Sequence, residues 1–378
     1  MNAKTIIGVI VLLIVIAGGW YLVSKTPAST DTGTGPIKIG VIVPLTGEAA
    51  SYGEAAKNGL NVALKELNDA GGIKGRQVQL VYEDDKCDSS SVSAMQKLVS
   101  VDGVVAIIGP VCSAAAGPAI PIARDAGTPE ILIGASAPGL AGGDDSIFSD
   151  YASDNFQGKY VANYIYKTLG KKSAAILYVK NDWGQGLQKV FSDEFQKLGG
   201  TIVFNDGAAQ DATDVKSIVT KMKAANPDVI YMPVYPALAV IAMKQMKQIG
   251  ITQPVVGGDA LEASEFLSSG AADGVTYVTA AVGNSDAFQA KVKAVNGQDA
   301  VINIITPLGY DALNVYAQVI GEKGTNAKDI IAGLKALDYK TGVSFPEISY
   351  DQNGDLKQAS YDVKIVKGTT PQIITPAQ

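Results

Sequence analysis

Short apolar runs that favour strands alternate with helix-like segments along most of this chain. Residues 37–43 (IKIGVIV) form the first run, and residues 54–70 follow with apolar side chains at helical spacing. The alternation continues to residue 133 and restarts after Asp150. Further strands are expected at residues 174–179, 201–204, 229–233 and 255–256. Because alternating strands and helices favour parallel sheets covered by helices on both faces, the pattern predicts an α/β protein with two doubly wound, parallel-sheet lobes.

A long uncharged segment stands near the N-terminus. Residues 6–23 carry no charge over eighteen positions, and Lys4 precedes them. Signal-peptide cores usually extend over about 7–15 residues, whereas a bilayer span needs about 17–25. Residues 1–25 are therefore expected to form a transmembrane signal anchor that tethers the chain to the cytoplasmic membrane, with a cleaved signal peptide as the alternative. Residues 26–36 form a flexible linker, and the protein is predicted to be extracytoplasmic, in the periplasm or on the cell surface.

Composition argues against several classes of function. The net charge of −6 and the pI of about 4.9 give no basic surface for nucleic acid. The chain has no histidine, which removes Ser-His-Asp and Cys-His nucleophiles and histidine metal sites. No glycine-rich nucleotide motif follows the first strand. We therefore expect no catalytic residue, no cofactor and no metal; a hydrolase that pairs Asp259 with Asp182 or Glu262 is the enzymatic alternative.

The chain has two cysteines, Cys87 and Cys112, which are 25 positions apart. An isolated pair in an exported protein favours a disulfide. Two unrelated buried thiols are the alternative.

Polar and aromatic residues follow the ends of the expected strands, where ligands bind in open α/β sheets. Ser113 opens a helix expected at residues 115–125, and a helix start with a hydroxyl can hold a carboxylate. Asp259, the Gly134 carbonyl and the Ser136 hydroxyl can hold an ammonium group, and such charge-assisted contacts are strong. Three aromatic residues can close over a side chain: Tyr52, Trp183 and Tyr235. The set predicts a zwitterionic ligand, although capping by Ser113 or Asp259 and packing by Trp183 are the structural alternatives.

The C-terminal part departs from the alternation. Helices are expected at residues 307–321 and 326–337. Residues 347–350 and 360–366 are expected to pair as a hairpin around the turn-forming sequence DQNGD at residues 351–355.

Five ordered stretches carry a resemblance to a known family. They are IKIGVIVPLTGEAASYGE at residues 37–54, LNDAGGIKGRQVQLVYEDDKCD at 67–88, IGPVCSAAAGPA at 108–119, GASAP at 134–138 and YDQNGDLK at 350–357. Together they resemble the periplasmic branched-chain amino acid-binding proteins of ABC transporters, the leucine/isoleucine/valine-binding type.

The resemblance implies a type I periplasmic binding fold, a clamp of two lobes joined by three hinge crossings. The crossings are expected at residues 150–155, 280–284 and 338–344. Lobe 1 would comprise residues 37–152 and 283–342, and lobe 2 residues 153–282 and 343–378.

The resemblance also implies roles for single residues. Cys87 and Cys112 would form the disulfide; Cys112 is also expected in the ligand site, because it follows the same strand end as Ser113. Ser113 would hold the ligand carboxylate, and the ammonium would contact Gly134, Ser136 and Asp259. The aromatic lid would be formed by Tyr52, Trp183 and Tyr235. Three positions depart from the family pattern: Asp259 replaces the usual glutamate, Trp183 a common tyrosine, and Ala114 a hydroxyl residue.

The function that follows is that of a solute-binding receptor for an ABC importer. Its expected partners are an amino acid, most often branched-chain in this family, a membrane permease, and the membrane itself through the N-terminal helix; the clamp is expected to be monomeric. A sensing receptor for an amide or another small solute is the alternative.

Overall fold

The computed structural model describes residues 33–141 and 146–375. The expected signal anchor and most of the linker lie outside this part of the chain. Within the described ranges, no helix is both long enough and apolar enough to cross a membrane.

Five parallel strands form the sheet of lobe 1. They are β1 (Ile37–Val43), β2 (Val78–Asp84), β3 (Ala106–Ile108), β4 (Glu130–Leu132) and β5 (Ile147–Ser149). Their order is β2-β1-β3-β4-β5, so the strand order reverses between β1 and β3. In doubly wound sheets the crevice at this reversal is where ligands bind. Tyr52 follows β1 and Ser113 follows β3, which places both residues at the crevice.

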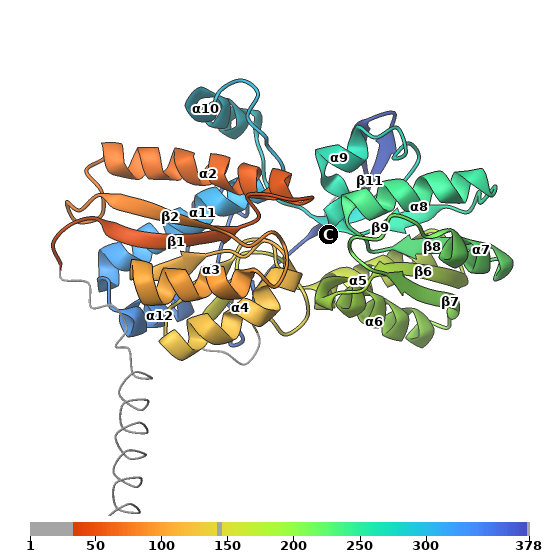
Figure 1. The fold of residues 1–378 in the computed structure, drawn as a ribbon, viewed down its shortest axis with the longest axis horizontal. Coiled ribbons are helices and arrows are strands. Elements are labelled where there is room, and N and C mark those ends of the chain that lie inside the picture. The colour runs from red at the N-terminus through yellow and green to blue at the C-terminus, as the bar shows by residue number, and fades with distance from the viewer. Residues whose placement is uncertain (1–32, 142–145, 376–378) are drawn as a thin grey trace, which may run out of the picture.

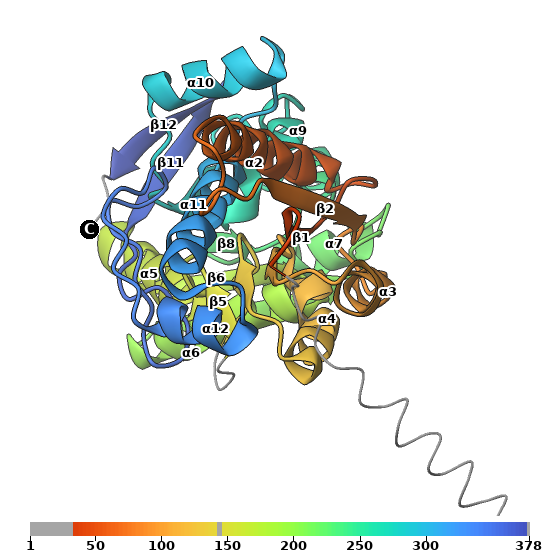
Figure 2. The same cartoon turned by 90° about the vertical axis from the view of Figure 1, so that its left-hand side faces the viewer.

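Helices cover both faces of this sheet (Figures 1 and 2). One layer contains α2 (Ala50–Asp69), α11 (Ile305–Lys323) and α10 (Asp286–Asn296), with α12 (Ala327–Lys335) beside α11; the other contains α3 (Ser91–Lys97), the π-helical turn η1 (Leu98–Asp102) and α4 (Ser113–Ala126). Gly59 permits the close contact of α2 with α11, because a Cβ there would lie 1.9 Å from the Thr306 carbonyl oxygen.

The sheet of lobe 2 has seven strands. They are β6 (Ser173–Val179), β7 (Thr201–Ala208), β8 (Val229–Met232), β9 (Val255–Gly257), β10 (Thr276–Ala280), β11 (Tyr361–Lys367) and β12 (Thr370–Thr375). The order is β12-β11-β10-β9-β8-β6-β7, with β6 to β10 parallel and the last two strands antiparallel. The prediction of two parallel-sheet lobes is thus confirmed, with an antiparallel edge added to the second.

Lobe 2 is also covered on two faces. α5 (Asp154–Asn163), its π-helical extension η2 (Tyr164–Thr168) and α6 (Asp182–Lys197) form one layer; α7 (Lys216–Ala224), α8 (Pro236–Gln248), the 3₁₀ turn η3 (Asp259–Glu262) and α9 (Ser264–Leu267) lie opposite, as Figure 1 shows. Six of the described elements were not predicted: β5, β10, α10, η3, α9 and β12 (Thr370–Thr375). β5, η3 and α9 are only three or four residues long and leave almost no periodic signal.

The predicted C-terminal hairpin is wrong. β11 pairs with β10 on one side and with β12 on the other, through a turn at Gly368. Residues 347–350 contribute only isolated bridges, one of them from Tyr350 to Leu356. The Asp351 carboxylate accepts the backbone N–H groups of Asn353 and Asp355 at 2.8 and 3.1 Å. This local turn folds the segment back on itself instead of starting a long hairpin.

Three crossings join the lobes. The first connects β5 to α5, and the second connects β10 to α10. The third lies further along the chain than residues 338–344. The Ser344 amide donates to Asp311 of α11, and the Ser149 amide of β5 donates to the Gly354 carbonyl at 2.9 Å. The Lys357 amide also donates to the Ser349 carbonyl, so the chain stays on lobe 1 through Lys357. It crosses at residues 358–360, where the Ser360 carbonyl accepts the Ala281 amide of the second crossing.

Candidate functional site

A pocket lies between the two sheets, at the carboxyl ends of their strands. Its cavity volume is about 50 Å³. A single buried water needs about 10–15 Å³ on this measure, so the pocket has room for a small solute. Its lining is Tyr52, Val111, Cys112, Ser113, Gly134, Tyr151, Trp183, Tyr235, Asp259, Ala260, Ile304 and Ile305.

Seven of the eight residues predicted for ligand binding line this pocket, and Ser136 lies directly behind its wall. The structure adds an apolar side that strand-end reasoning missed: Val111, Ile304 and Ile305. The last two belong to the start of α11, whose N-terminal boundary was expected at residue 307. Gly134 contributes by its smallness, since a Cβ there would lie 2.9 Å from the Val111 carbonyl oxygen and 3.1 Å from Ile305 Cδ1.

Ser113 is the first residue of α4, and Cys112 is its N-cap. The Ser113 hydroxyl oxygen accepts the backbone amides of Ser136 and Ala137, both at 3.1 Å. Its hydrogen is therefore left to donate. The simple capping interpretation of Ser113 is not what the structure shows, because the hydroxyl bonds the neighbouring loop instead of its own helix.

Ser136 connects this loop to lobe 2. Its hydroxyl donates to Asp154 Oδ2 at 3.0 Å, and its carbonyl accepts the Asp154 amide at 2.9 Å. The lone pairs of the Ser136 oxygen remain free to accept a hydrogen bond from a ligand. Asp154 was not predicted, because it follows a crossing and not a strand of its own lobe. The sequence did contain a helix-start signal there, since Ser153 is the N-cap of α5 and Asp154 is the acid in its first turn.

Asp259 is the first residue of η3 and is 6% exposed. One of its oxygens accepts the Ala260 amide at 3.0 Å. Burial raises the pKa of the Asp259 carboxyl, while the nearby Tyr151 hydroxyl and Gln157 amide lower it. The Tyr151 hydroxyl and the Gln157 side-chain amide lie near the Asp259 carboxyl without forming a well-aligned hydrogen bond to it. Gln157 and Tyr151 are thus further polar residues at this end of the site, and both were missed.

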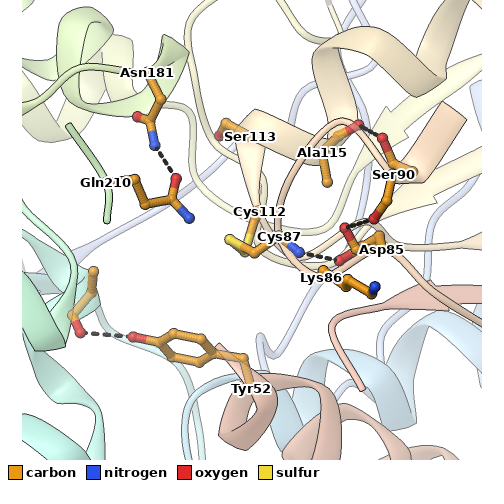
Figure 3. Close-up of a disulfide and its surroundings, with 12 residues drawn as sticks. Tyr52, Asp85, Lys86, Cys87, Ser90, Cys112, Ser113, Ala115, Asn181 and Gln210 are labelled. Atoms are coloured by element: carbon orange, nitrogen blue, oxygen red, sulfur yellow. Dashed lines mark hydrogen bonds between the residues drawn. A yellow bond between two sulfur atoms is a disulfide. The ribbon is translucent and has the colours of Figure 1, made fainter. Parts of the chain in front are cut away.

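The aromatic residues come from both lobes. Trp183 of α6 stacks on Tyr235, the N-cap of α8, with ring centroids 5.0 Å apart and planes 5° apart. Tyr52 of α2 donates from its hydroxyl to the Ala260 carbonyl at 2.7 Å, a bond drawn in Figure 3. Since Tyr52 belongs to lobe 1 and Ala260 to lobe 2, this bond links the two lobes beside the pocket.

The predicted disulfide between Cys87 and Cys112 is present, with an S–S length of 2.10 Å and Cα atoms 5.3 Å apart. It ties the loop after β2 to the N-cap of α4 (Figure 3). The Asp85 carboxylate accepts the Cys87 amide at 2.8 Å. The disulfide therefore fixes the position of the residue immediately before Ser113.

The acid pairs expected of a hydrolase are not formed. Glu262 bonds Lys364 and does not line the pocket. Asp182 lies in a separate outer groove, beside Gly186 of the same helix. Asn181 caps α6 by accepting the Gly184 amide at 3.0 Å and donates to Gln210, as Figure 3 shows.

Comparison with known proteins agrees with this geometry. Residues 36–370 match the family model described as periplasmic binding protein. A Leu/Ile/Val-binding protein homolog from Brucella melitensis is 30% identical over 86% of this chain and 90% of its own. A Leu/Ile/Val-binding protein from Rhizobium johnstonii is 31% identical over the same shares.

Solved structures give the same result. A leucine-binding protein from Thermotoga maritima superposes with a TM-score of 0.81 at 26% identity, over 90% of this chain and 98% of its own. A branched-chain amino acid transporter substrate-binding protein from Streptococcus pneumoniae, solved with isoleucine, gives a TM-score of 0.79 at 28% identity, over 90% of this chain and all of its own. With two doubly wound lobes, three crossings and a pocket between them, this chain belongs to the periplasmic binding protein family.

Proposed function

We propose that this protein is the solute-binding receptor of an ABC importer and that it binds a branched-chain amino acid between its two lobes. The observation that carries the proposal is a polar strip along the pocket. A hydroxyl donor stands at one end, at Ser113, and carboxyl groups stand at the other, at Asp259 and Asp154.

The two ends of the strip suit the two charges of an α-amino acid. The Ser113 hydroxyl and the first amides of α4 can donate to a carboxylate, because the N-terminus of a helix favours negative charge. The Asp259 carboxyl, the Ser136 oxygen and the Gly134 carbonyl can accept from an ammonium group. Asp259 is one methylene shorter than glutamate, so the ammonium would lie closer to η3 than a glutamate would place it.

The remaining wall suits an apolar side chain of modest size. Val111, Ile304 and Ile305 form one side, and the stacked rings of Trp183 and Tyr235 form the other. No charged side chain other than Asp259 lines the pocket within the described residues. A long charged ligand side chain would therefore lose its hydration without gaining a partner.

Closure of the lobes about the crossings would complete the site, by the hinge motion of periplasmic binding proteins. Tyr52 would report closure through its bond to Ala260. We place lobe 1 at residues 37–152 and 283–357 and lobe 2 at residues 153–282 and 358–375. The receptor would act outside the cytoplasm, tethered by residues 6–23, and deliver its ligand to a membrane permease.

Isothermal titration calorimetry of the purified protein against the twenty amino acids tests the proposal. We expect one-to-one binding of leucine, isoleucine or valine that is lost in Ser113→Ala and in Asp259→Ala. Asp299→Asn, an exposed acid on lobe 1, is the matched control and should bind as the wild type does. Binding of a different solute, or equal binding by Asp259→Ala, would overturn the proposed ligand.

A further inference from the structure

Two buried carboxyl groups interact at one end of the pocket: Asp259 lines it, and Asp154 stands behind its wall, bonded to Ser136. Asp154 is fully buried, and its Oδ1 atom has no hydrogen-bond partner. In the described part of the chain, the Ser136 hydroxyl is the one group that bonds its other oxygen. Asp259 is 6% exposed and lines the pocket itself. Among residues 33–141 and 146–375, no lysine or arginine forms an ion pair with either carboxyl.

The groups nearest the pair are neutral hydroxyls and amides. Tyr151 stands on the first crossing, Gln157 on α5, Tyr231 on β8 and Tyr361 on β11, and Tyr235, Tyr52 and Ser136 lie nearby as well. Three further carboxyls lie in the surroundings: Asp85 near Tyr235, and Glu262 and Glu265 near Tyr52. Lys364, on β11, is bonded to Glu262, so it does not neutralise the pair.

Two adjacent carboxylates in such a place repel each other and lose their hydration. Burial raises the pKa of Asp154 well above its usual range, and the charge of Asp259 raises it further. For interacting acids of this kind, the proton belongs to the pair and not to one residue. Both residues lie in lobe 2, on α5 and η3, so opening of the clamp does not separate them.

We propose that Asp154 and Asp259 form an acid pair that holds one proton in the absence of ligand and exchanges it for the ammonium group of the ligand. This inference rests on the proposed amino-acid specificity. Ligand binding by this protein then releases a proton, and Asp154 is a specificity-determining residue that requires the ligand to carry a cation.

The exchange keeps the charge of the buried site constant. Before binding, one carboxylate and one carboxylic acid carry a charge of −1 in total. When the ammonium enters, the O–H bond of the acid breaks, the proton passes to water, and the two carboxylates with one ammonium again carry −1. A neutral amide or hydroxyl group in place of the ammonium would leave the proton on the pair and bring no charge to compensate for the repulsion.

Calorimetry with L-leucine tests the release directly. The binding enthalpy is measured at pH 7 in phosphate, HEPES and Tris, whose ionisation enthalpies differ. The slope against ionisation enthalpy gives the number of protons exchanged, and we expect about one proton released per leucine. The association constant should also rise about tenfold per pH unit below the titration of the pair. A slope of zero in the wild type would overturn the proposal.

Two isosteric variants identify the source of the proton. Asp154→Asn should bind leucine with no proton release, because a single carboxylate remains to balance the ammonium. Asp259→Asn removes the carboxylate that binds the ammonium and should weaken leucine binding, so it serves through the ligand-free spectra below if Asp154→Asn does not fold. Asp355→Asn removes a partly buried acid far from the pocket and should keep the full slope. If Asp154→Asn retains the wild-type slope, the proton comes from elsewhere and the proposal is wrong.

A ligand-free measurement separates this inference from the identity of the ligand. Infrared difference spectra of the protein without amino acid at pH 7 isolate the pair, because other buried acids such as Asp150 cancel in them. Wild type minus Asp154→Asn, or minus Asp259→Asn, should contain a protonated-carboxyl band, whereas wild type minus Asp355→Asn should contain no comparable band. A spectrum of wild type minus Asp154→Asn without this band would refute the shared proton. If leucine fails to bind while the band behaves as expected, the proposed specificity fails and the acid pair stands.

Discussion

The hydroxyl of Tyr350 donates a hydrogen bond to the carboxyl of Asp150, and so joins the C-terminal part of the chain to the first crossing. Both residues are buried, and the Tyr350 ring packs on Phe148 at a centroid distance of 5.0 Å. The second oxygen of Asp150 has no partner, and Asp311 of α11 adds a nearby negative charge. The hinge region of this clamp thus contains an acid that is costly to ionise.

This acid predicts a stability that falls as the pH rises. Burial raises the pKa of Asp150 to about 7, and Asp311 adds to the increase while the Tyr350 hydroxyl opposes it. The pKa of an aspartate in the unfolded protein is about 3.9. Between pH 4 and 7 the folded protein therefore binds more protons at Asp150 than the unfolded protein does, and its free energy of unfolding falls as the pH rises through this range. Asp150→Asn should be more stable than the wild type at pH 8 by roughly 2–4 kcal/mol, with no gain at pH 4.

Urea unfolding at pH 4, 6 and 8 checks this prediction. Asp299→Asn, an exposed acid, is the control and should follow the wild type at every pH. A wild type and an Asp150→Asn variant that differ by the same amount at all three pH values would contradict it.

The contact between α2 and α11 predicts opposite effects for two glycines. Gly59→Ala should destabilise the protein by roughly 1–3 kcal/mol, because its Cβ would collide with the Thr306 carbonyl oxygen. Gly321→Ala, in α11, meets only Ile73 Cγ2 at 3.9 Å and should stabilise by up to about 1 kcal/mol through helix propensity. Thermal unfolding of both variants tests this prediction. If both substitutions raised the Tm, the packing of α2 on α11 would be looser than described.

The disulfide should support both stability and ligand binding. Replacing Cys87 and Cys112 together by serine should cost roughly 3 kcal/mol, by the loop-entropy estimate for a loop of this length. Affinity should fall as well, because Cys112 is the N-cap of the helix that begins with Ser113. Denaturant unfolding with and without a reducing agent tests this: the reductant should destabilise the wild type and leave the double variant unchanged.

The bond between Tyr52 and Ala260 should contribute to affinity and not to the stability of the separate lobes. Loss of this hydrogen bond in Tyr52→Phe should weaken leucine binding about 3- to 10-fold, from a contribution of about 1 kcal/mol. Tyr310→Phe removes a hydroxyl that bonds Glu66 within lobe 1, away from the pocket, and should leave affinity unchanged. Calorimetric titration of both variants with leucine tests this prediction. Equal losses of affinity in Tyr52→Phe and Tyr310→Phe would mean that the Tyr52 hydroxyl does not act through its bond to lobe 2.

The amino-acid sequence by itself determined the two-lobed α/β class, the position of most strands and the family. Strand and helix periods are local properties, so they can be read from short segments such as residues 37–43. The sequence also identified the pocket residues that follow strands of the parallel sheets, since chain direction places all of these strand ends at one edge. Ser113, Trp183 and Asp259 were found in this way.

The tertiary structure alone decided which residues meet across the crossings. Asp154 follows a crossing, and Ile304 and Ile305 stand at the start of α11, 150 and 151 positions after Asp154 in the chain. Tyr361 belongs to β11, in the antiparallel part of the second sheet. The third crossing was misplaced because the carboxylate of Asp311, on α11, holds residues 343–344 on lobe 1. These contacts depend on how distant segments pack. No local period in the chain encodes that packing, and the buried acid pair therefore became visible only in the folded protein.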